Sequence, residues 1–362
     1  MMQQLLRGRV LYVVLGLLTV SLYLWLRPVI RVTPSEVVSS ESRPSVQDRT
    51  GAGQAVESDS LEWWPEDLDR AAFQRLAMKQ PRLAILLSVL TAWGMGLGLA
   101  GLMLLVGALR NGRIRSVWRF APHRLPPWSF GELGRITLLL LVVTLLLPFI
   151  YFASRSSGER GVMDPHLRIT VSMMVLDVCT ALIILAFAVG KGRTVWRTFG
   201  FSRRKLTGSI AVGLRSYVGV FPWLFILLLV TAAVFQALGL KPPREPIQEL
   251  VFQEHRPLVL GLMALLTCAI GPIAEEFFFR GVVYPAIRQR TSWMVATLVS
   301  GTLFALLHAN PIGFPSILLL GCLLTNLYER TGSLAGPLAV HVLHNTFLIS
   351  AALVFRQVLA VS

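Results

Sequence analysis

Two adjacent glutamates and an arginine occur inside an apolar stretch of the sequence, "IAEEFFFRGVVYP", residues 273–285. Glu276 and Arg280 are four residues apart, a spacing that places two side chains on one side of a helix. Glu275 is rotated by about 100° from Glu276, and no basic residue follows it one turn later. The spacing therefore predicts that Arg280 neutralises Glu276, and that Glu275 is free to act on another group.

Three of the six histidines follow this stretch. His308 lies in "FALLHANP", and "SLAGPLAVHVLHNTF" contains His341, His344 and Asn345. Because His341 and Asn345 are also four residues apart, their side chains share a helix face. A glutamate pair, two histidine-bearing helices and an asparagine together indicate a site.

These groups suit the hydrolysis of a peptide bond. Glu275 with His308 can deprotonate a water molecule, and His341 with Asn345 can donate hydrogen bonds to the oxyanion that develops on the carbonyl. The same groups can instead hold zinc, with Glu275, His308 and His341 as ligands and water in the open position. The sequence has no HExxH motif, and the spacing leaves both the metal-free and the zinc-dependent mechanism open.

The composition indicates where such a site must be built. Hydrophobic residues make up 54% of the 362 residues and charged residues only 15%, whereas a soluble domain has about 25% charged residues. Nine apolar runs approach the length that crosses a membrane, so we expect an all-α polytopic membrane bundle of about eight or nine transmembrane helices. The runs lie at residues 10–26, 83–109, 137–153, 169–190, 208–239, 257–287, 293–309, 314–328 and 335–355.

Two of these runs have more than one interpretation. The run 208–239 exceeds one span and contains Arg215 and Pro222, so both a single tilted helix and an interfacial helix leading into a span are open. The run 10–26 follows a basic start but precedes "RPVIRV", which is no cleavage site, so we expect an uncleaved anchor.

The net charge of +15 is explained by the orientation of the chain in the membrane. Basic residues concentrate in alternate loops, as the positive-inside rule describes, which places those loops and the N terminus in the cytoplasm of a cell with an inner (plasma) membrane. The basic stretches lack the modules of nucleic-acid-binding proteins, so we exclude a nucleic-acid partner. The basic loops are residues 110–124, 191–205 and 288–290, and the mixed loops are 154–168 and 241–256.

The organisation along the chain follows from these runs. We expect an N-terminal transmembrane anchor at 1–26, an extracytoplasmic linker with a short amphipathic helix at 27–82, accessory transmembrane helices at 83–256 and a catalytic transmembrane core at 257–362. Asp177 and Arg215 are isolated charges inside apolar runs, for which a structural role is expected. The three cysteines predict core packing, with no disulfide and no metal.

Three motifs in order resemble one family. "EEFFFR" matches EExxxR, "FALLH" matches FxxxH, and "SLAGPLAVHVLHN" matches SxxxPxxxHxxxN. This part of the chain, roughly 257–352, is similar to the CPBP (Abi) family of intramembrane endopeptidases, which includes the type II CAAX prenyl endopeptidases. The resemblance implies a protease whose catalytic residues are Glu275, His308, His341 and Asn345.

The resemblance also sorts the neighbouring residues. It implies that Glu276 and Arg280 support the site, and that Phe304 and Pro337 pack. His344 is outside the pattern, so a packing role is expected for it. The expected partners are the bilayer and a membrane-associated peptide or protein substrate, whose identity the motifs do not give. A non-catalytic binding or scaffold protein is the main alternative, and a transporter is less favoured because no repeated or paired broken helices occur.

Overall fold

The computed structural model describes residues 78–110, 125–156, 164–190, 194–201, 203–240 and 246–359. Within these ranges every regular element is a helix, so the predicted all-α class is confirmed. The predicted anchor at 1–26 and almost all of the linker at 27–82 lie outside the described residues. The three cysteines, all inside the described ranges, are free thiols.

Six described helices are long and apolar enough to cross a membrane, and the chain is therefore a multi-pass membrane protein. Together with the shorter apolar helix α14 (Trp293–Leu307) and with α15 (Phe314–Thr331), they correspond to eight of the nine predicted runs. The spans are α4 (Pro81–Arg110), α6 (Phe130–Ser156), α7 (Pro165–Gly190), α9 (Arg203–Ala237), the continuous segment Pro257–Arg288 and α16 (Ala335–Leu359). Two short helices, α8 (Val195–Thr198) and α10 (Pro246–Gln253), lie in connections.

The run 208–239 is one helix, α9, with Pro222 inside it, and not an interfacial helix joined to a span. Pro222 cannot donate a backbone hydrogen bond, so the Val218 carbonyl loses its helical partner. Helix α4 approaches at this point through Gly101, where an added Cβ would lie 2.3 Å from the Val218 oxygen. Only glycine permits this close contact between α4 and α9.

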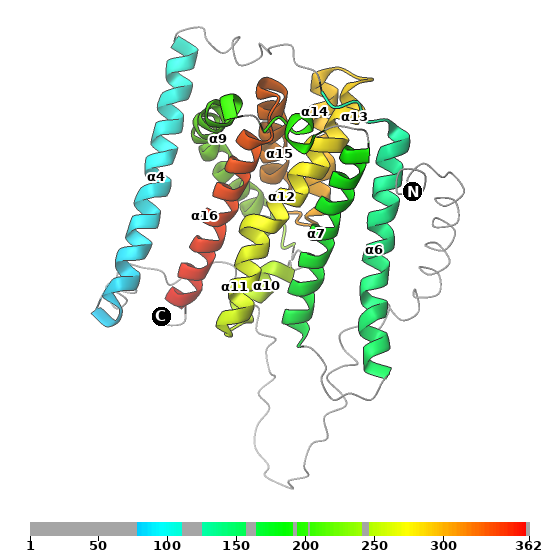
Figure 1. Ribbon diagram of the computed structural model, residues 1–362. Coiled ribbons are helices and arrows are strands. Elements are labelled where there is room, and N and C mark those ends of the chain that lie inside the picture. Colours follow the sequence, from blue (N-terminus) through cyan, green and yellow to red (C-terminus); the bar gives the residue numbers. More distant parts are fainter. Residues whose placement is uncertain are drawn as a thin grey trace.

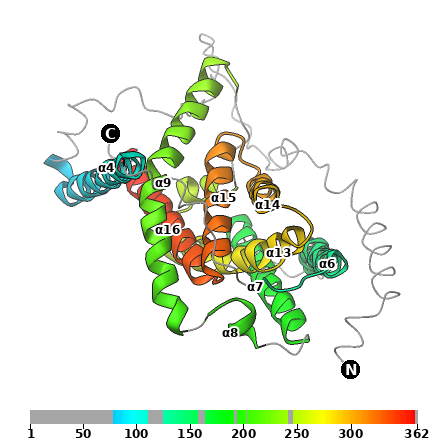
Figure 2. The same cartoon turned by 90° about the horizontal axis from the view of Figure 1, so that it is seen from above.

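The C-terminal helices form the centre of the bundle. Helix α15 (Phe314–Thr331) packs against α9, α14 and α16, and α16 also packs against α9. Figures 1 and 2 show α4 and α6 at opposite edges of this arrangement, with α7, α9, α15 and α16 between them. Two of the C-terminal helices, α15 and α16, therefore pack against helices that precede them in the chain, α9 in both cases and also α4 for α16.

Helices α14 (Trp293–Leu307) and α15 form a tight hairpin. An added Cβ on Gly321 would lie 3.1 Å from the Gly301 Cα, so two glycines allow the backbones to meet. The 15 residues of α14 extend about 22 Å, less than the roughly 30 Å of the hydrocarbon core. A helix of this length that begins at one face of the membrane ends before the other face, and the turn with His308 follows its end.

Candidate active site

The segment Pro257–Arg288, which contains both glutamates, is not a regular α-helix throughout. Two π-helical stretches, η2 (Leu266–Ile270) and η3 (Glu276–Val283), flank the short α-helix α12 (Gly271–Glu275). Helices α11 (Pro257–Leu265) and α13 (Tyr284–Arg288) complete the segment. Wide turns of this kind are rare in proteins as a whole. Where they do occur, they are often found at functional sites. Glu275 and Glu276 lie at the boundary where the helical register changes.

Asn345 of α16 supports the first wide turn. The Gly271 N–H donates to the Leu266 carbonyl, five residues back, and Pro272 has no N–H to offer. The Thr267 carbonyl therefore receives no hydrogen bond from the backbone N–H of residue 271 or 272. The side-chain amide of Asn345 donates to this carbonyl instead, at 2.9 Å. One amide hydrogen of Asn345 is thus used for structure, and the amide carries a second hydrogen.

The predicted pairing of Glu276 with Arg280 is present. The Arg280 Nη1 and Glu276 Oε1 are 2.7 Å apart, and both side chains are fully buried. The second guanidinium nitrogen, Nη2, donates to the Gly321 carbonyl of α15 at 3.1 Å. The guanidinium also lies over the Phe304 ring, 4.4 Å from its centroid. Arg280 therefore joins three helical segments as well as neutralising a carboxylate.

His341 lies between the two glutamates. Its Nδ1 donates to Glu276 Oε1 at 2.9 Å, and its Nε2 is 3.6 Å from Glu275 Oε2. Both ring nitrogens therefore face carboxylate oxygens. The ring is buried, so this contact takes place away from bulk water. The sequence assigned His341 to the oxyanion and did not predict its place between the carboxylates.

The carboxylate of Glu275 is the accessible member of this group, although Glu276 Oε2 likewise has no hydrogen-bond partner among the described residues. Among the described residues, the buried Oε2 atom of Glu275 has no hydrogen-bond partner, since 3.6 Å from His341 is an ion-pair distance only. About a third of the Glu275 side chain is exposed, whereas Glu276 is buried. Glu275 is therefore the carboxylate that an additional molecule can reach.

His308 has a fixed orientation at the end of α14. Its Nδ1 donates to the Phe304 carbonyl at 2.8 Å, and because a carbonyl only accepts, this nitrogen carries a proton. The Phe304 ring centroid lies 4.7 Å from that of His308 and 5.6 Å from that of His341. Phe304, which the motif reading gave to packing, thus contacts both catalytic candidates.

Helices that precede the motifs contribute groups that the sequence did not assign to the site. Tyr217 of α9 places its hydroxyl 3.0 Å from Nδ1 of His344 and is itself buried. His344 is therefore held by a partner, in agreement with a packing role. Asp177 of α7 lies beside Gly271, and its charge inside an apolar run was the one signal available in the sequence. Arg215 is exposed on α9.

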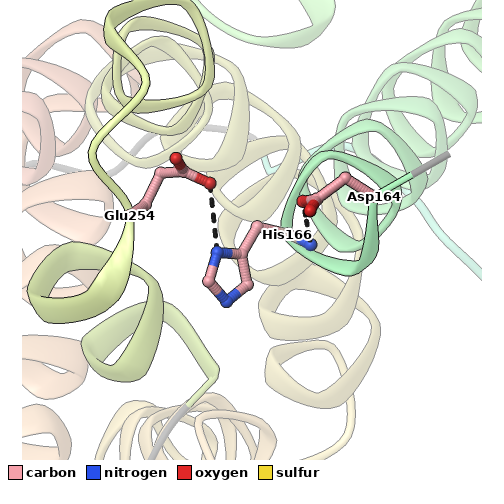
Figure 3. Close-up of side chains that lie close together, drawn as sticks. All are labelled: Asp164, His166 and Glu254. Carbon is pink, nitrogen blue, oxygen red and sulfur yellow. Dashed lines mark hydrogen bonds and ion pairs between the residues drawn. The ribbon is translucent and has the colours of Figure 1, made fainter. Parts of the chain in front are cut away.

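The geometry does not bring together the proposed zinc ligands Glu275, His308 and His341. In the described part of the chain, one group of three potential ligands has its ligand atoms within 4.8 Å of one another, and it consists of Asp164, His166 and Glu254 (Figure 3). That group is already occupied by protein contacts, because Arg256 pairs with both carboxylates.

Comparison with known proteins gives matches in the same segment. Residues 257–347 match a family model described as type II CAAX prenyl endopeptidase Rce1-like. YdiL of Bacillus subtilis (strain 168), whose name describes it as a proposed membrane peptidase, is 31% identical over 88 residues, which are 24% of this chain and 36% of that protein. The membrane-embedded CAAX protease MroQ of Staphylococcus aureus (strain USA300) is 31% identical over 86 residues, 22% of this chain and 35% of MroQ.

A third relative is matched over a longer stretch. An uncharacterized 24.3 kDa protein of Escherichia coli is 29% identical over 149 residues, 39% of this chain and 67% of that protein. The chain spans only about a third of the length of YdiL and MroQ. No solved structure matches the chain.

Proposed function

Residues 257–347 form a domain of the CPBP family, and from this premise we propose that the protein is an endopeptidase that hydrolyses a peptide bond in a membrane-associated protein or peptide. The observation that carries the proposal is the state of Glu275. Its carboxylate is held inside the membrane beside His341, is partly accessible and has an oxygen that no protein group hydrogen-bonds in the described residues. A general base requires such a carboxylate.

In the proposed reaction, Glu275 takes a proton from a water molecule while the water oxygen bonds to the substrate carbonyl carbon. His308 orients this water through Nε2, since its Nδ1 is engaged with Phe304. The second amide hydrogen of Asn345 donates to the oxyanion, and His341 forms the polar wall of the site. The C–N bond then breaks, and Glu275 returns the proton to the leaving amine.

The proposed reaction needs no metal, and metal analysis tests this point. Purified protein is expected to cleave without stoichiometric zinc and to be insensitive to chelators. Activity that requires bound zinc, lost with chelator and restored by the metal, would replace the metal-free mechanism by one with zinc at Glu275, His308 and His341.

The proposed location is the inner (plasma) membrane. The alternation of basic and mixed loops supports it, because positive residues accumulate on the cytoplasmic side. A fusion reporter attached after residue 110 should report a cytoplasmic position. A signal that places the reporter on the opposite face of the membrane would show that the orientation is the reverse of the predicted one.

Substitution of Glu275 by Gln tests the peptidase itself. General-base catalysis contributes about 10²–10⁴-fold, so Glu275→Gln should lower cleavage by at least two orders of magnitude while the protein stays folded. The measurement compares C termini in membranes that contain the active protein or the variant, which also identifies the substrate. Asp164→Asn is the matched control, since it makes the same carboxylate-to-amide change at the membrane edge and Asn also caps helices well. Unchanged cleavage in Glu275→Gln would exclude Glu275 as the base.

A further inference from the structure

One ring nitrogen of His344 on α16 is engaged by a neighbouring helix, and the other is not. The Nδ1 atom lies 3.0 Å from the Tyr217 hydroxyl of α9, and the two rings meet edge to face with their centroids 5.9 Å apart. Among the described residues, Nε2 has no hydrogen-bond partner. This nitrogen is not one of the enclosed polar atoms that lack a partner, so it borders space that another molecule can reach.

The Tyr217 hydroxyl fixes where the imidazole of His344 carries its hydrogen. Tyr217 is buried, packs edge to face against Phe221 and bonds to no other group in the described part of the chain. A buried hydroxyl hydrogen without an acceptor is costly, so the hydroxyl donates to Nδ1. No carboxylate of the described residues bonds to His344, and a charge inside the membrane is costly, so the ring is neutral. A neutral imidazole whose Nδ1 accepts a hydrogen bond carries its hydrogen on Nε2.

This N–H lies among the residues assigned to the proposed reaction. The two nitrogens of an imidazole diverge from one another, so Nε2 is directed away from the Tyr217 hydroxyl. His344 comes one residue before Asn345 on α16 and one turn after His341. His341 and His308 are both near enough to act on the His344 ring electrostatically. The site therefore has a donor with a fixed direction in addition to the amide of Asn345.

A donor at this place suits a substrate that is cleaved within the membrane. A peptide segment that is unwound for cleavage has carbonyl groups that have lost their helical N–H donors. Inside the hydrocarbon there is no water to replace these donors, so each such carbonyl requires a hydrogen-bond donor from the protein. A donor for the oxyanion satisfies one carbonyl only, and the carbonyls beside the cleaved bond need others.

We infer that His344, held with its hydrogen on Nε2, donates to a backbone carbonyl of the substrate next to the cleaved bond, and that Tyr217 is a positioning residue for this contact. The inference rests on the proposed function and adds a substrate-binding group to it. The substrate that it implies is a segment that is unwound at the cleaved bond. Because this neighbouring carbonyl is unchanged by the reaction, the contact is equally strong in the ground state and in the transition state.

The state of the His344 ring is tested without a substrate. Full-length protein labelled with ¹⁵N-histidine is purified in detergent, and the ring resonances of His344 are assigned by their loss in His344→Phe. We expect a protonated Nε2 and an unprotonated Nδ1, and Tyr217→Phe should shift the Nδ1 resonance because the donor to Nδ1 is gone. A proton on Nδ1 in the wild type, or an Nδ1 resonance that is the same in Tyr217→Phe, would overturn the inference.

The contact with the substrate is tested by cleavage kinetics on the substrate that the new C termini identify. His344→Phe should raise KM about tenfold with little change in kcat, as expected for one lost hydrogen bond that is equally strong in both states. Tyr217→Phe should raise KM by less, because the donor remains but its direction is no longer fixed. A residue needed only for packing would lower the amount of folded protein and would not change KM selectively. Tyr284→Phe is the matched control, since it removes a buried hydroxyl that bonds to Glu329 at 2.7 Å, and it should leave KM unchanged.

Failure of this inference is distinguishable from failure of the peptidase proposal. An active enzyme whose KM is the same in His344→Phe would overturn the substrate contact alone. Cleavage that persists in Glu275→Gln would count against the proposed mechanism, and the resonances of His344 would still decide the state of its ring. If His344→Phe does not fold, His344→Gln and His344→Asn take its place, because the Gln amide reaches the position of Nε2 and the Asn amide reaches only that of Nδ1. KM should then rise in His344→Asn and not in His344→Gln, and equal KM values in the two variants would overturn the inference.

Discussion

Two clusters in this protein contain the same kinds of group, namely two carboxylates, one histidine and one arginine. The core cluster is Glu275, Glu276, Arg280 and His341, and the edge cluster is Asp164, His166, Glu254 and Arg256. The core cluster lies within membrane-spanning segments, whereas the edge cluster lies where α7 and α11 begin. Their chemistry differs because of how the arginine is used.

In the edge cluster, the arginine saturates both carboxylates. Arg256 bonds to Asp164 and to Glu254, and its Nε donates to Glu254 at 2.9 Å. The Nδ1 of His166 donates to the other Glu254 oxygen at 3.0 Å. Figure 3 shows the imidazole directed at Glu254 and Asp164 next to it. Every acidic group has a partner here, so the cluster ties the start of α7 to the segment before α11.

In the core cluster, the arginine serves one carboxylate only. Arg280 bonds to Glu276 and to a backbone carbonyl, and His341 is the ion-pair partner of Glu275. Each carboxylate has one oxygen, Oε2, without a hydrogen-bond partner among the described residues, but Glu275 is partly exposed and Glu276 is buried. The same kinds of group therefore stabilise the fold in the edge cluster and leave an accessible carboxylate in the core cluster.

The largest effect is expected from removing the arginine of the core cluster. Arg280→Met leaves Glu276 as a buried carboxylate without its cation, and breaking a buried pair costs about 3–5 kcal/mol. The variant should show a large drop in melting temperature in detergent, or no folded protein. The double variant Glu276→Gln/Arg280→Met should recover much of the loss, because both charges are then gone.

Arg256→Met in the edge cluster is the matched comparison. It should lower the melting temperature much less, since this side chain is half exposed and water solvates the groups left behind. Equal effects of the two arginine substitutions would refute the distinction between the clusters.

The fold was largely predictable because a membrane imposes a length and a composition on each helix. The apolar runs at 83–109 and 335–355 gave α4 and α16 in this way. The pairing of Glu276 with Arg280 was also accessible, since it depends only on a spacing of four residues along one helix.

The other contacts of the site depend on how separate helices meet. His341 reaches both glutamates because α16 packs against the segment that contains them, and the spacing along one helix holds no information on this contact. Asn345 supports a wide turn that could not be seen in a run of apolar residues. Asp177 stands out in the sequence as a charge inside an apolar run, but Gly271, beside which it lies, follows more than 90 residues later.

Acid is expected to weaken the edge cluster. Hydrogen bonds from Arg256 lower the pKa of Glu254 and of Asp164 below the ordinary carboxyl values, with the burial of each group opposing this in part. A folded pKa below the unfolded one adds stability that is present above the unfolded value, about 4, and is lost as the pH falls through the folded value. The melting temperature of the wild type should therefore decline as the pH is lowered from about 5 towards 3.

Glu254→Gln serves as the comparison for this pH dependence. The variant should have a lower melting temperature than the wild type at neutral pH. The difference between the two melting temperatures should become smaller in acid, because the wild type then loses the same interaction. A gap that stays constant between neutral pH and the acid end of the range would show that the Glu254 carboxylate contributes no linked stability.

The smallest effect is expected from salt, which distinguishes the clusters by their access to water. At about 1 M salt the screening length falls to about 3 Å, so the half-exposed Arg256 loses part of its attraction to Asp164. The difference in melting temperature between wild type and Arg256→Met should shrink from low to high salt by at most a few degrees. The fully buried pair of Glu276 and Arg280 is not screened, so the gap between wild type and Glu276→Gln/Arg280→Met should not change. If both differences in melting temperature depended on salt, ions would also reach the core cluster. The two clusters would then differ in their bonding and not in their exposure to solvent.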